Sequence, residues 1–231
     1  MKKEEYIRNE QEKITKAVTD KYKEYYLTGG TALSFYFNHR FSVDLDFFTQ
    51  KYKKDLPGKI VNFISEYTGY KFTLEAEQKD PELIPMKVYS FTLKKGELLK
   101  IDFVQDYEKN INKVKDGLHS VEDIYCRKMI AAMGVQKKES ITGELIPSGR
   151  QSVKDLFDLY YLSKNYKALS AFFQEYFSVA DSERLIIWYR RFNRMDLKLE
   201  LLDLVPGVDT AAVIKYMDDE ILKNLVDKFI M

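Results

Sequence analysis

The residues best suited to chemistry are two aspartates, Asp44 and Asp46, in the segment SVDLDFF. Apolar residues alternate with them, which predicts a strand over 43–48. Because successive side chains of a strand point to opposite faces, both carboxylates are expected on one face, roughly 7 Å apart. Such a pair repels itself unless a cation lies between the charges, and Mg²⁺ prefers carboxylate oxygens together with substrate phosphate oxygens.

A glycine turn precedes this strand. Gly29-Gly30-Thr31 follows a short apolar strand over 25–28 and opens a predicted helix over 32–39. The glycines let the backbone approach a ligand, Thr31 offers a hydroxyl, and the free N–H groups at the start of a helix favour an anion. Phosphate on the turn and metal on the strand indicate a nucleotide site. The plainer alternative is an ordinary strand-turn-helix-strand with a solvated D-x-D.

These residues resemble a known family. Gly30-Thr31, twelve residues and then Asp44-x-Asp46 are similar to the signature G-[GS]-x(about 9 to 13)-D-x-D of the DNA polymerase beta-like nucleotidyltransferase superfamily. The fuller string GGTAL…HRFSVDLDFF resembles more narrowly the AbiEii/AbiGii-type toxin nucleotidyltransferases of bacterial toxin–antitoxin and phage-defence systems. Thr31 replaces the commoner Ser and keeps its hydroxyl.

A third aspartate, Asp102, stands in LLKIDFV, the second strand of a hairpin predicted over 86–93 and 97–105. A carboxylate in the middle of an apolar strand is costly to bury without a partner. The resemblance implies that Asp102 is the third carboxylate, which joins the D-x-D pair around the metals from a neighbouring strand. A solvent-facing Asp102 on an open sheet is the alternative.

From Ser120 the hydrophobic period changes to 3.6, which predicts a helix with Lys128 at the centre of its apolar stripe. An inward lysine either snorkels out to water or meets a negative ligand. In the family resembled, the lysine of a K-x-x-A helix contacts the nucleotide triphosphate, and Lys128-Met-Ile-Ala131 fits that pattern. The stripe itself is predicted to comprise Val121, Ile124, Tyr125, Ala131, Ala132 and Val135.

The helical pattern breaks over Gly143–Gly149, and Ser152 is predicted to cap the helix VKDLFDLYYLS. Asp155 would complete an acidic capping box with Ser152. This helix is apolar nearly all round, so we expect it to be buried. With Arg150, the pair Asp155 and Asp158 resembles the family's last motif, R…D-x-x-D, although capping alone explains Asp155 equally well.

Composition bounds the function. The chain has 231 residues, of which 45% are hydrophobic and 32% charged, and its net charge is +1. The protein as a whole therefore lacks the strong positive potential of many nucleic-acid binders, and any RNA-binding surface must be a local patch. Arg190, Arg191 and Arg194 could grip RNA phosphate or form a solvated helix face. The single cysteine, Cys126, excludes an internal disulfide. The absence of a long apolar run and of a signal peptide's apolar region predicts a cytoplasmic location without membrane spans.

The predicted fold class is α+β, with a nucleotidyltransferase-type mixed β-sheet flanked by helices and followed by a helical C-terminal domain. The expected division is a nucleotidyltransferase core over 1–118 and a helical domain over 119–231 that completes the nucleotide site. The resemblance implies catalytic roles for Asp44, Asp46, Asp102, Lys128 and Asp158, with the first three as metal ligands. It further implies nucleotide-binding roles for Gly29, Gly30, Thr31, Arg40, Ser42, Lys128 and Asp155.

The expected activity is the transfer of NMP from an NTP to an acceptor hydroxyl, dependent on Mg²⁺ or Mn²⁺. The resemblance implies a toxin of a toxin–antitoxin or phage-defence system, with a tRNA end or other RNA as acceptor and a cognate antitoxin encoded nearby. An antibiotic- or protein-modifying nucleotidyltransferase is an alternative on the same fold. A second alternative is a non-catalytic nucleotide-binding protein, but three carboxylates disfavour it because binding alone does not require them.

Overall fold

The computed structural model describes residues 3–134, 136–139 and 145–230. The chain divides into two compact units, Met1–Ile124 and Tyr125–Met231, and each is described by itself below. Within the described residues, every helix is too short or too polar to cross a bilayer.

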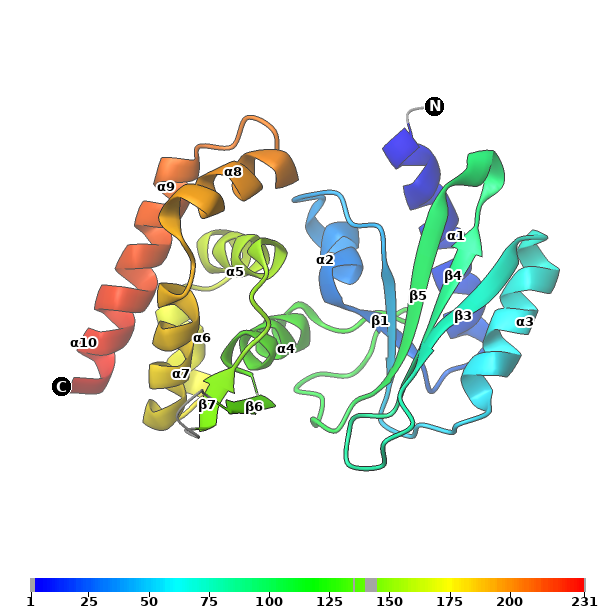
Figure 1. The fold of residues 1–231 in the computed structure, drawn as a ribbon, viewed down its shortest axis with the longest axis horizontal. Coiled ribbons are helices and arrows are strands. Elements are labelled where there is room, and N and C mark those ends of the chain that lie inside the picture. Colours follow the sequence, from blue (N-terminus) through cyan, green and yellow to red (C-terminus); the bar gives the residue numbers. More distant parts are fainter. Residues whose placement is uncertain (1–2, 135, 140–144, 231) are drawn as a thin grey trace. The chain divides into compact units, whose positions relative to one another are not determined.

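The first unit is built on a five-stranded mixed sheet in the order β1-β2-β5-β4-β3 (Figure 1). The central pair β2 and β5 is parallel, and the other neighbours are antiparallel. The strands are β1 (Tyr26–Thr28), β2 (Leu45–Thr49), β3 (Lys71–Glu77), β4 (Met86–Thr92) and β5 (Leu98–Gln105). The helices of this unit are α1 (Lys3–Lys21), α2 (Gly29–Phe37), α3 (Leu56–Thr68) and the start of α4 (Val121–Met133).

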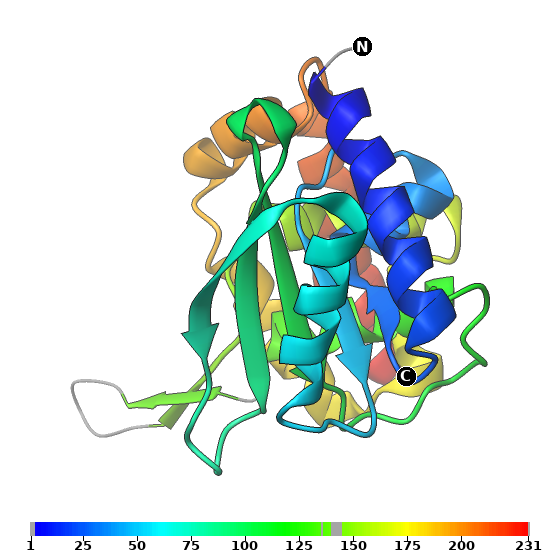
Figure 2. The ribbon, with the colours of Figure 1, turned by 90° about the vertical axis from the view of Figure 1, so that its right-hand side faces the viewer.

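One face of this sheet is apolar. Leu45 and Phe47 of β2 and Ile101 and Phe103 of β5 are fully buried, as the alternation along both strands requires. Helices α1 and α3 cover this face (Figure 2). The Phe47 and Phe103 rings stack at 5.7 Å between centroids, so the two central strands share one core. Their polar residues therefore point to the opposite face.

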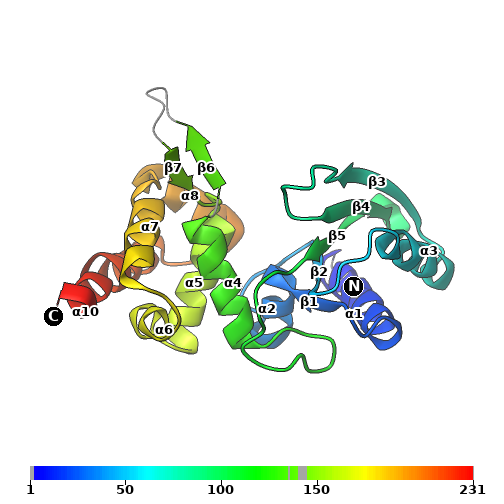
Figure 3. The same ribbon diagram turned by 90° about the horizontal axis from the view of Figure 1, so that it is seen from below.

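The second unit is helical apart from one hairpin, β6 (Gln136–Glu139) and β7 (Leu145–Ser148), seen in Figure 3. Its core contains Trp188 and a stacked pair, Tyr125 and Phe172, with ring centroids 4.1 Å apart. Trp188 thus belongs to the core. Besides α4, the helices are α5 (Val153–Asn165), α6 (Leu169–Tyr176), α7 (Val179–Arg190), α8 (Arg194–Leu204), α9 (Thr210–Met217), a π-helix (Asp218–Asn224) and α10 (Leu225–Ile230).

The described elements confirm the predicted α+β class, with a mixed sheet flanked by helices and a helical C-terminal part. The hairpin β6–β7 was not predicted, because its strands are short and lie in the segment where the helical pattern breaks. Val135 and Gly143 lie outside the described residues. The assignment of separate roles to 1–118 and 119–231 stays a prediction.

Strand β2 begins at Leu45, two residues later than predicted, so Asp44 precedes the ladder instead of lying within it. The reason is that a nearby side chain competes with the neighbouring strand for the Asp44 backbone: the Thr31 hydroxyl donates a hydrogen bond to the Asp44 carbonyl. Asp46 is therefore the only member of the D-x-D pair inside the strand.

We expect Phe103→Ala to lower the free energy of unfolding by about 3–5 kcal/mol, because the ring is fully buried among Phe47, Tyr25 and Tyr89. Urea denaturation followed by circular dichroism measures this change. Leu98→Ala on the same strand is the matched control, since its side chain is 64% exposed, and it should shift stability by no more than about 0.5 kcal/mol. Equal losses for the two variants would contradict the assigned core face.

Candidate active site

The candidate site of the first unit centres on two carboxylates that belong to a row of register partners across three strands. Thr28 of β1, Asp46 of β2 and Asp102 of β5 are consecutive register partners. Residues in register on neighbouring strands point to the same face, so the two carboxylates lie side by side on the face opposite the apolar core. The sheet brings these carboxylates together although 55 residues separate them in the sequence.

The glycine turn closes one end of this row. Gly29 has a φ of +72°, a conformation that side chains rarely adopt, and a Cβ there would overlap the Asp46 carboxylate. At Gly30 a Cβ would come within 2.5 Å of Nη2 of Arg40. Both glycines are therefore required for the backbone to lie against charged side chains.

The remaining residues predicted for nucleotide binding tie the turn to β2. The hydroxyl oxygens of Thr31 and Ser42 lie 2.9 Å apart, and the Ser42 hydroxyl donates to Thr31, whose own hydrogen goes to the Asp44 carbonyl. Arg40 is buried, and its Nη1 donates to the Phe41 carbonyl at 3.1 Å. Together they hold the loop between α2 and β2. The triphosphate contacts predicted for these side chains stay predictions.

Lys100 is a charged neighbour of the carboxylates that the sequence analysis did not select as a site residue. Its Nζ lies 2.8 Å from Oδ2 of Asp102. Burial lowers the pKa of the Lys100 ammonium, but the hydrogen bond and charge of Asp102, with the charges of Asp44 and Asp46, raise that pKa more, and the net shift is upward. Lys100 therefore stays charged and offsets part of the carboxylate repulsion.

Over the described residues, no group of three or more His, Cys, Asp and Glu side chains is arranged to hold a metal ion. The donor chemistry nevertheless suits Mg²⁺: Asp46 and Asp102 are adjacent carboxylates, and Asp44 is a half-exposed carboxylate two residues from Asp46. The Lys100 ammonium occupies one oxygen of Asp102, so a divalent ion that binds this oxygen would have to displace Lys100.

The second unit contains a separate buried charge cluster. Nζ of Lys128 lies 2.6 Å from Oδ1 of Asp155 and 2.7 Å from Oδ2 of Asp158. Arg150 binds the Asp155 carboxylate with two donors, at 2.7 and 2.8 Å. The side chains of both aspartates are fully buried and that of Lys128 is 7% exposed. The alternative in which Lys128 snorkels out to water is therefore wrong, because its ammonium lies between two buried carboxylates.

The predicted capping box at the start of α5 is also wrong. Ser152 occupies the N-cap position, yet its side chain makes no capping hydrogen bond. Asp155 is instead held by Arg150 and Lys128, a stronger arrangement for an ionised carboxylate. Asp155 thus forms an internal ion pair, and its predicted nucleotide-binding role stays a prediction.

The backbone around Arg150 is fixed inside the same unit. Its N–H donates to the Ala131 carbonyl at 3.0 Å, and its own carbonyl accepts from Nε1 of Trp188 at 2.9 Å. A Cβ at Gly149 would overlap the Ala132 carbonyl, so only glycine allows this approach. The connection into α5 is thereby pinned to α4.

Arg194, one of the arginines considered for RNA contacts, has partners inside the protein. Its guanidinium donates to the Tyr189 hydroxyl at 2.7 Å and pairs with Asp218 at 2.6 Å. This arginine supports the packing of the second unit.

Comparison with solved structures defines the class of fold. JHP933 from Helicobacter pylori is similar to this chain with a TM-score of 0.59 and 21% sequence identity, over 98% of this chain and 94% of that chain. A second H. pylori protein, described as a candidate nucleotidyltransferase, has a TM-score of 0.59 and 20% identity, over 100% of this chain and 99% of its own. At these identities the likeness shows a shared fold.

The sequence defines the family. Residues 17–227 match the family described as nucleotidyl transferase AbiEii toxin, type IV TA system. The chain therefore belongs to the AbiEii family of toxin–antitoxin nucleotidyltransferases, which confirms the resemblance and the enzyme class inferred from its motifs. No curated protein shows detectable similarity to it.

Asp155→Asn should destabilise the protein by roughly 3–5 kcal/mol at neutral pH, because it removes one carboxylate of a buried ion pair. Burial raises the pKa of the Asp155 carboxyl, but Lys128 and Arg150 lower it more, and the folded-state pKa lies below its ordinary value. The unfolded state therefore binds protons more readily, and this stabilisation is lost as the pH falls through the folded-state pKa. Melting temperatures of wild type and variant should converge in acid.

The matched control is Glu175→Gln, which removes the carboxylate of an exposed ion pair with Lys167 in the same unit. Its melting temperature should equal that of the wild type at every pH. A gap between wild type and Asp155→Asn that stays constant from neutral to acid pH would show that the charge of Asp155 is not the cause.

Proposed function

We propose that this AbiEii-family nucleotidyltransferase transfers NMP from an NTP to an acceptor hydroxyl in a reaction that requires Mg²⁺ or Mn²⁺. The observation that carries the proposal is the placement of Asp46 and Asp102 as register partners beside the Gly29-Gly30 turn. A carboxylate pair and a backbone able to approach phosphate are the two components that such chemistry needs.

Five residues of the first unit have a definite part in this proposal. Asp44, Asp46 and Asp102 would hold the metal, which supplies positive charge to the phosphate oxygens and the leaving group. The N–H groups of Gly30 and Thr31 receive the triphosphate. The acceptor oxygen forms a bond to the α-phosphorus as the bond to the bridging oxygen breaks, and pyrophosphate leaves. The Asp102 carboxylate takes the hydroxyl proton.

The proposed acceptor is a tRNA end, and the proposed place of action is the cytoplasm. Membership of a toxin family supports a macromolecular target whose modification arrests growth, and a type IV toxin–antitoxin system implies an antitoxin partner. The contact of Lys128 with the triphosphate stays a prediction, and so does the catalytic role of Asp158.

The test incubates the purified protein with Mg²⁺, with one α-labelled NTP at a time, and with either total RNA or total protein. We expect label in the tRNA fraction with at least one NTP. Asp46→Asn should reduce this labelling by about two orders of magnitude or more, because it removes one of the carboxylates proposed to hold the metal ion. Labelling is followed by electrophoresis and phosphorimaging, with melting temperature as the check on folding.

Glu75→Gln, an exposed carboxylate on edge strand β3, is the control and should label at the wild-type rate. Label in the protein fraction instead would indicate a protein-modifying enzyme, and NTP binding without any transfer would indicate a nucleotide-binding protein. Undiminished labelling by Asp46→Asn, or in excess EDTA, would overturn the proposal.

Lys100→Met should strengthen Mn²⁺ binding to the nucleotide-free protein by roughly three- to tenfold, because Lys100 competes with the metal for Asp102. Isothermal titration calorimetry measures this affinity without any reaction. Lys71→Met, an exposed lysine on β3, should leave it unchanged. Weaker Mn²⁺ binding by Lys100→Met would show that Lys100 supports the metal ligands instead of competing with the ion.

A further inference from the structure

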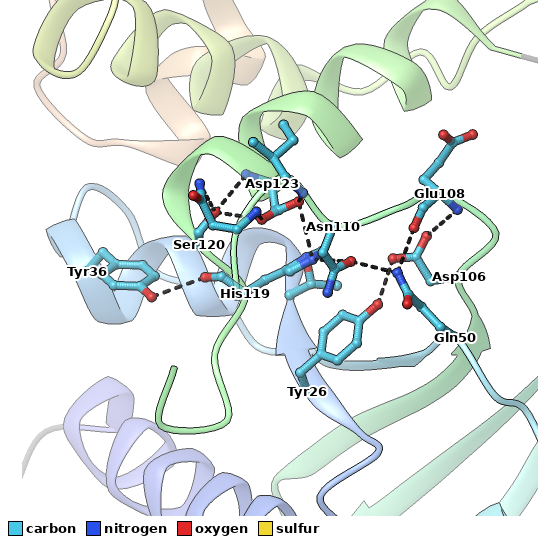
Figure 4. Close-up of polar contacts among 12 residues, drawn as sticks. Tyr26, Tyr36, Gln50, Asp106, Glu108, Asn110, His119, Ser120 and Asp123 are labelled. Carbon is cyan, nitrogen blue, oxygen red and sulfur yellow. Dashed lines mark hydrogen bonds and ion pairs between the residues drawn. The ribbon is translucent and has the colours of Figure 1, made fainter. Parts of the chain in front are cut away.

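The connection between β5 and α4 carries a buried polar network that the proposed reaction does not use (Figure 4). His119 lies at its centre, is fully buried, and packs against the Tyr26 ring with centroids 4.5 Å apart. Its Nδ1 lies 3.0 Å from Oγ1 of Thr28, and its Nε2 lies 3.1 Å from Oδ1 of Asn110. The imidazole therefore links this connection to the last residue of β1.

The partners of His119 indicate which nitrogen carries the proton. Oδ1 of Asn110 also accepts from Nε2 of Gln50 at 3.0 Å, and Asp123 lies 3.7 Å from Nε2 of His119. An acceptor and a carboxylate on this side place a proton on Nε2. Nδ1 is then an acceptor, and the Thr28 hydroxyl donates its hydrogen to it.

This hydrogen bond decides what the Thr28 side chain does. Thr28 is the N-cap residue of α2 and has the extended backbone, φ −135° and ψ −165°, that suits a cap. Threonine is a favoured N-cap because its oxygen can accept from the N–H groups two and three residues on, here Gly30 and Thr31. The Thr28 side chain makes no such bond. Its hydroxyl is turned to His119 instead.

We propose that His119 is a positioning residue of the nucleotide site: it holds the Thr28 hydroxyl away from α2, so that the N–H groups of Gly30 and Thr31 remain available to phosphate. This inference rests on the proposed function. A side-chain cap would compete with the ligand for the same two donors. His119 removes that competitor without touching the nucleotide.

The backbone of His119 is anchored independently of its ring. Its N–H donates to the Leu27 carbonyl at 2.9 Å, and its carbonyl accepts from the Tyr36 hydroxyl at 3.1 Å. A substitution of the imidazole therefore leaves two ties between this connection, β1 and α2. His119→Phe keeps an aromatic ring against Tyr26 and removes the contacts of both ring nitrogens, with Thr28 and with Asn110. Combining it with a Thr28 variant separates the first contact from the second.

Three variants test the proposal with magnesium tripolyphosphate as the probe, titrated by calorimetry. His119→Phe should bind the probe about three- to tenfold more weakly, the scale of one capping interaction. Thr28→Val has no hydroxyl and should bind it like the wild type. The double variant His119→Phe/Thr28→Val should regain the Thr28→Val affinity, a rescue that general damage to the fold would not produce.

Amide hydrogen exchange in the ligand-free protein tests the role of His119 independently of the proposed function. Exchange at Gly30 and Thr31 should be slower in His119→Phe than in wild type, since the released Thr28 hydroxyl caps them, and should recover in the double variant. A wild-type protein that does not bind tripolyphosphate would count against the proposed function, while the exchange rates still test His119.

Two results would overturn the role of His119. One is a double variant that stays as weak as His119→Phe in probe binding. The other is a loss of affinity in Thr28→Val alone, which would show that the Thr28 hydroxyl is itself a ligand. This second test does not depend on whether a His119 variant folds.

Discussion

The register between β2 and β5 is the constraint on which the first unit depends. These parallel strands bury Leu45, Phe47, Ile101 and Phe103 on one face. Because side chains alternate, the same register places Asp46 beside Asp102 on the other face. A slip of one residue would turn the carboxylates into the core and the aromatic rings out. Core packing and the carboxylate pair are therefore one property, and neither can change without the other.

Charge compensation is the second theme of the molecule, and the two units solve it differently. In the first unit a partly exposed lysine, Lys100, pairs with Asp102, while the carboxylates of Asp44 and Asp46 are half-exposed. In the second unit the Lys128 ammonium lies between the fully buried carboxylates of Asp155 and Asp158, and the exposed side chain of Arg150 pairs with Asp155. The buried pairs of Lys128 are the costlier to break, because a charge without a partner would remain inside the protein.

The glycine turn shows how a flexible sequence becomes a rigid surface. Gly29 and Gly30 have no side chains, and charged groups of Asp46 and Arg40 occupy the space that a Cβ would need. Thr31 binds Ser42 in the loop that precedes β2, and Thr28 binds His119 on the other side. The turn is held from both ends by side chains, which leaves its backbone as the part that can face a ligand.

Local pattern was sufficient to predict much of the fold. The alternation in LLKIDFV predicts both the buried face of β5 and the placement of Lys100 on the same side as Asp102, and the 3.6 period after Ser120 predicts α4. The spacing of the glycine turn and the D-x-D pair was enough to indicate the family. These signals are local because backbone geometry repeats over two or nearly four residues.

Other features were decided by tertiary structure alone. The adjacency of Asp46 and Asp102 follows from a strand order in which β5 lies between β2 and β4, which no local period encodes. The partners of Lys128 and the contact of His119 with Thr28 also join residues far apart in the chain. By itself, the sequence determined the family, the elements and the faces of the strands. Only folding decided which charges meet, because such pairs depend on long-range packing whose free energy exceeds any local preference.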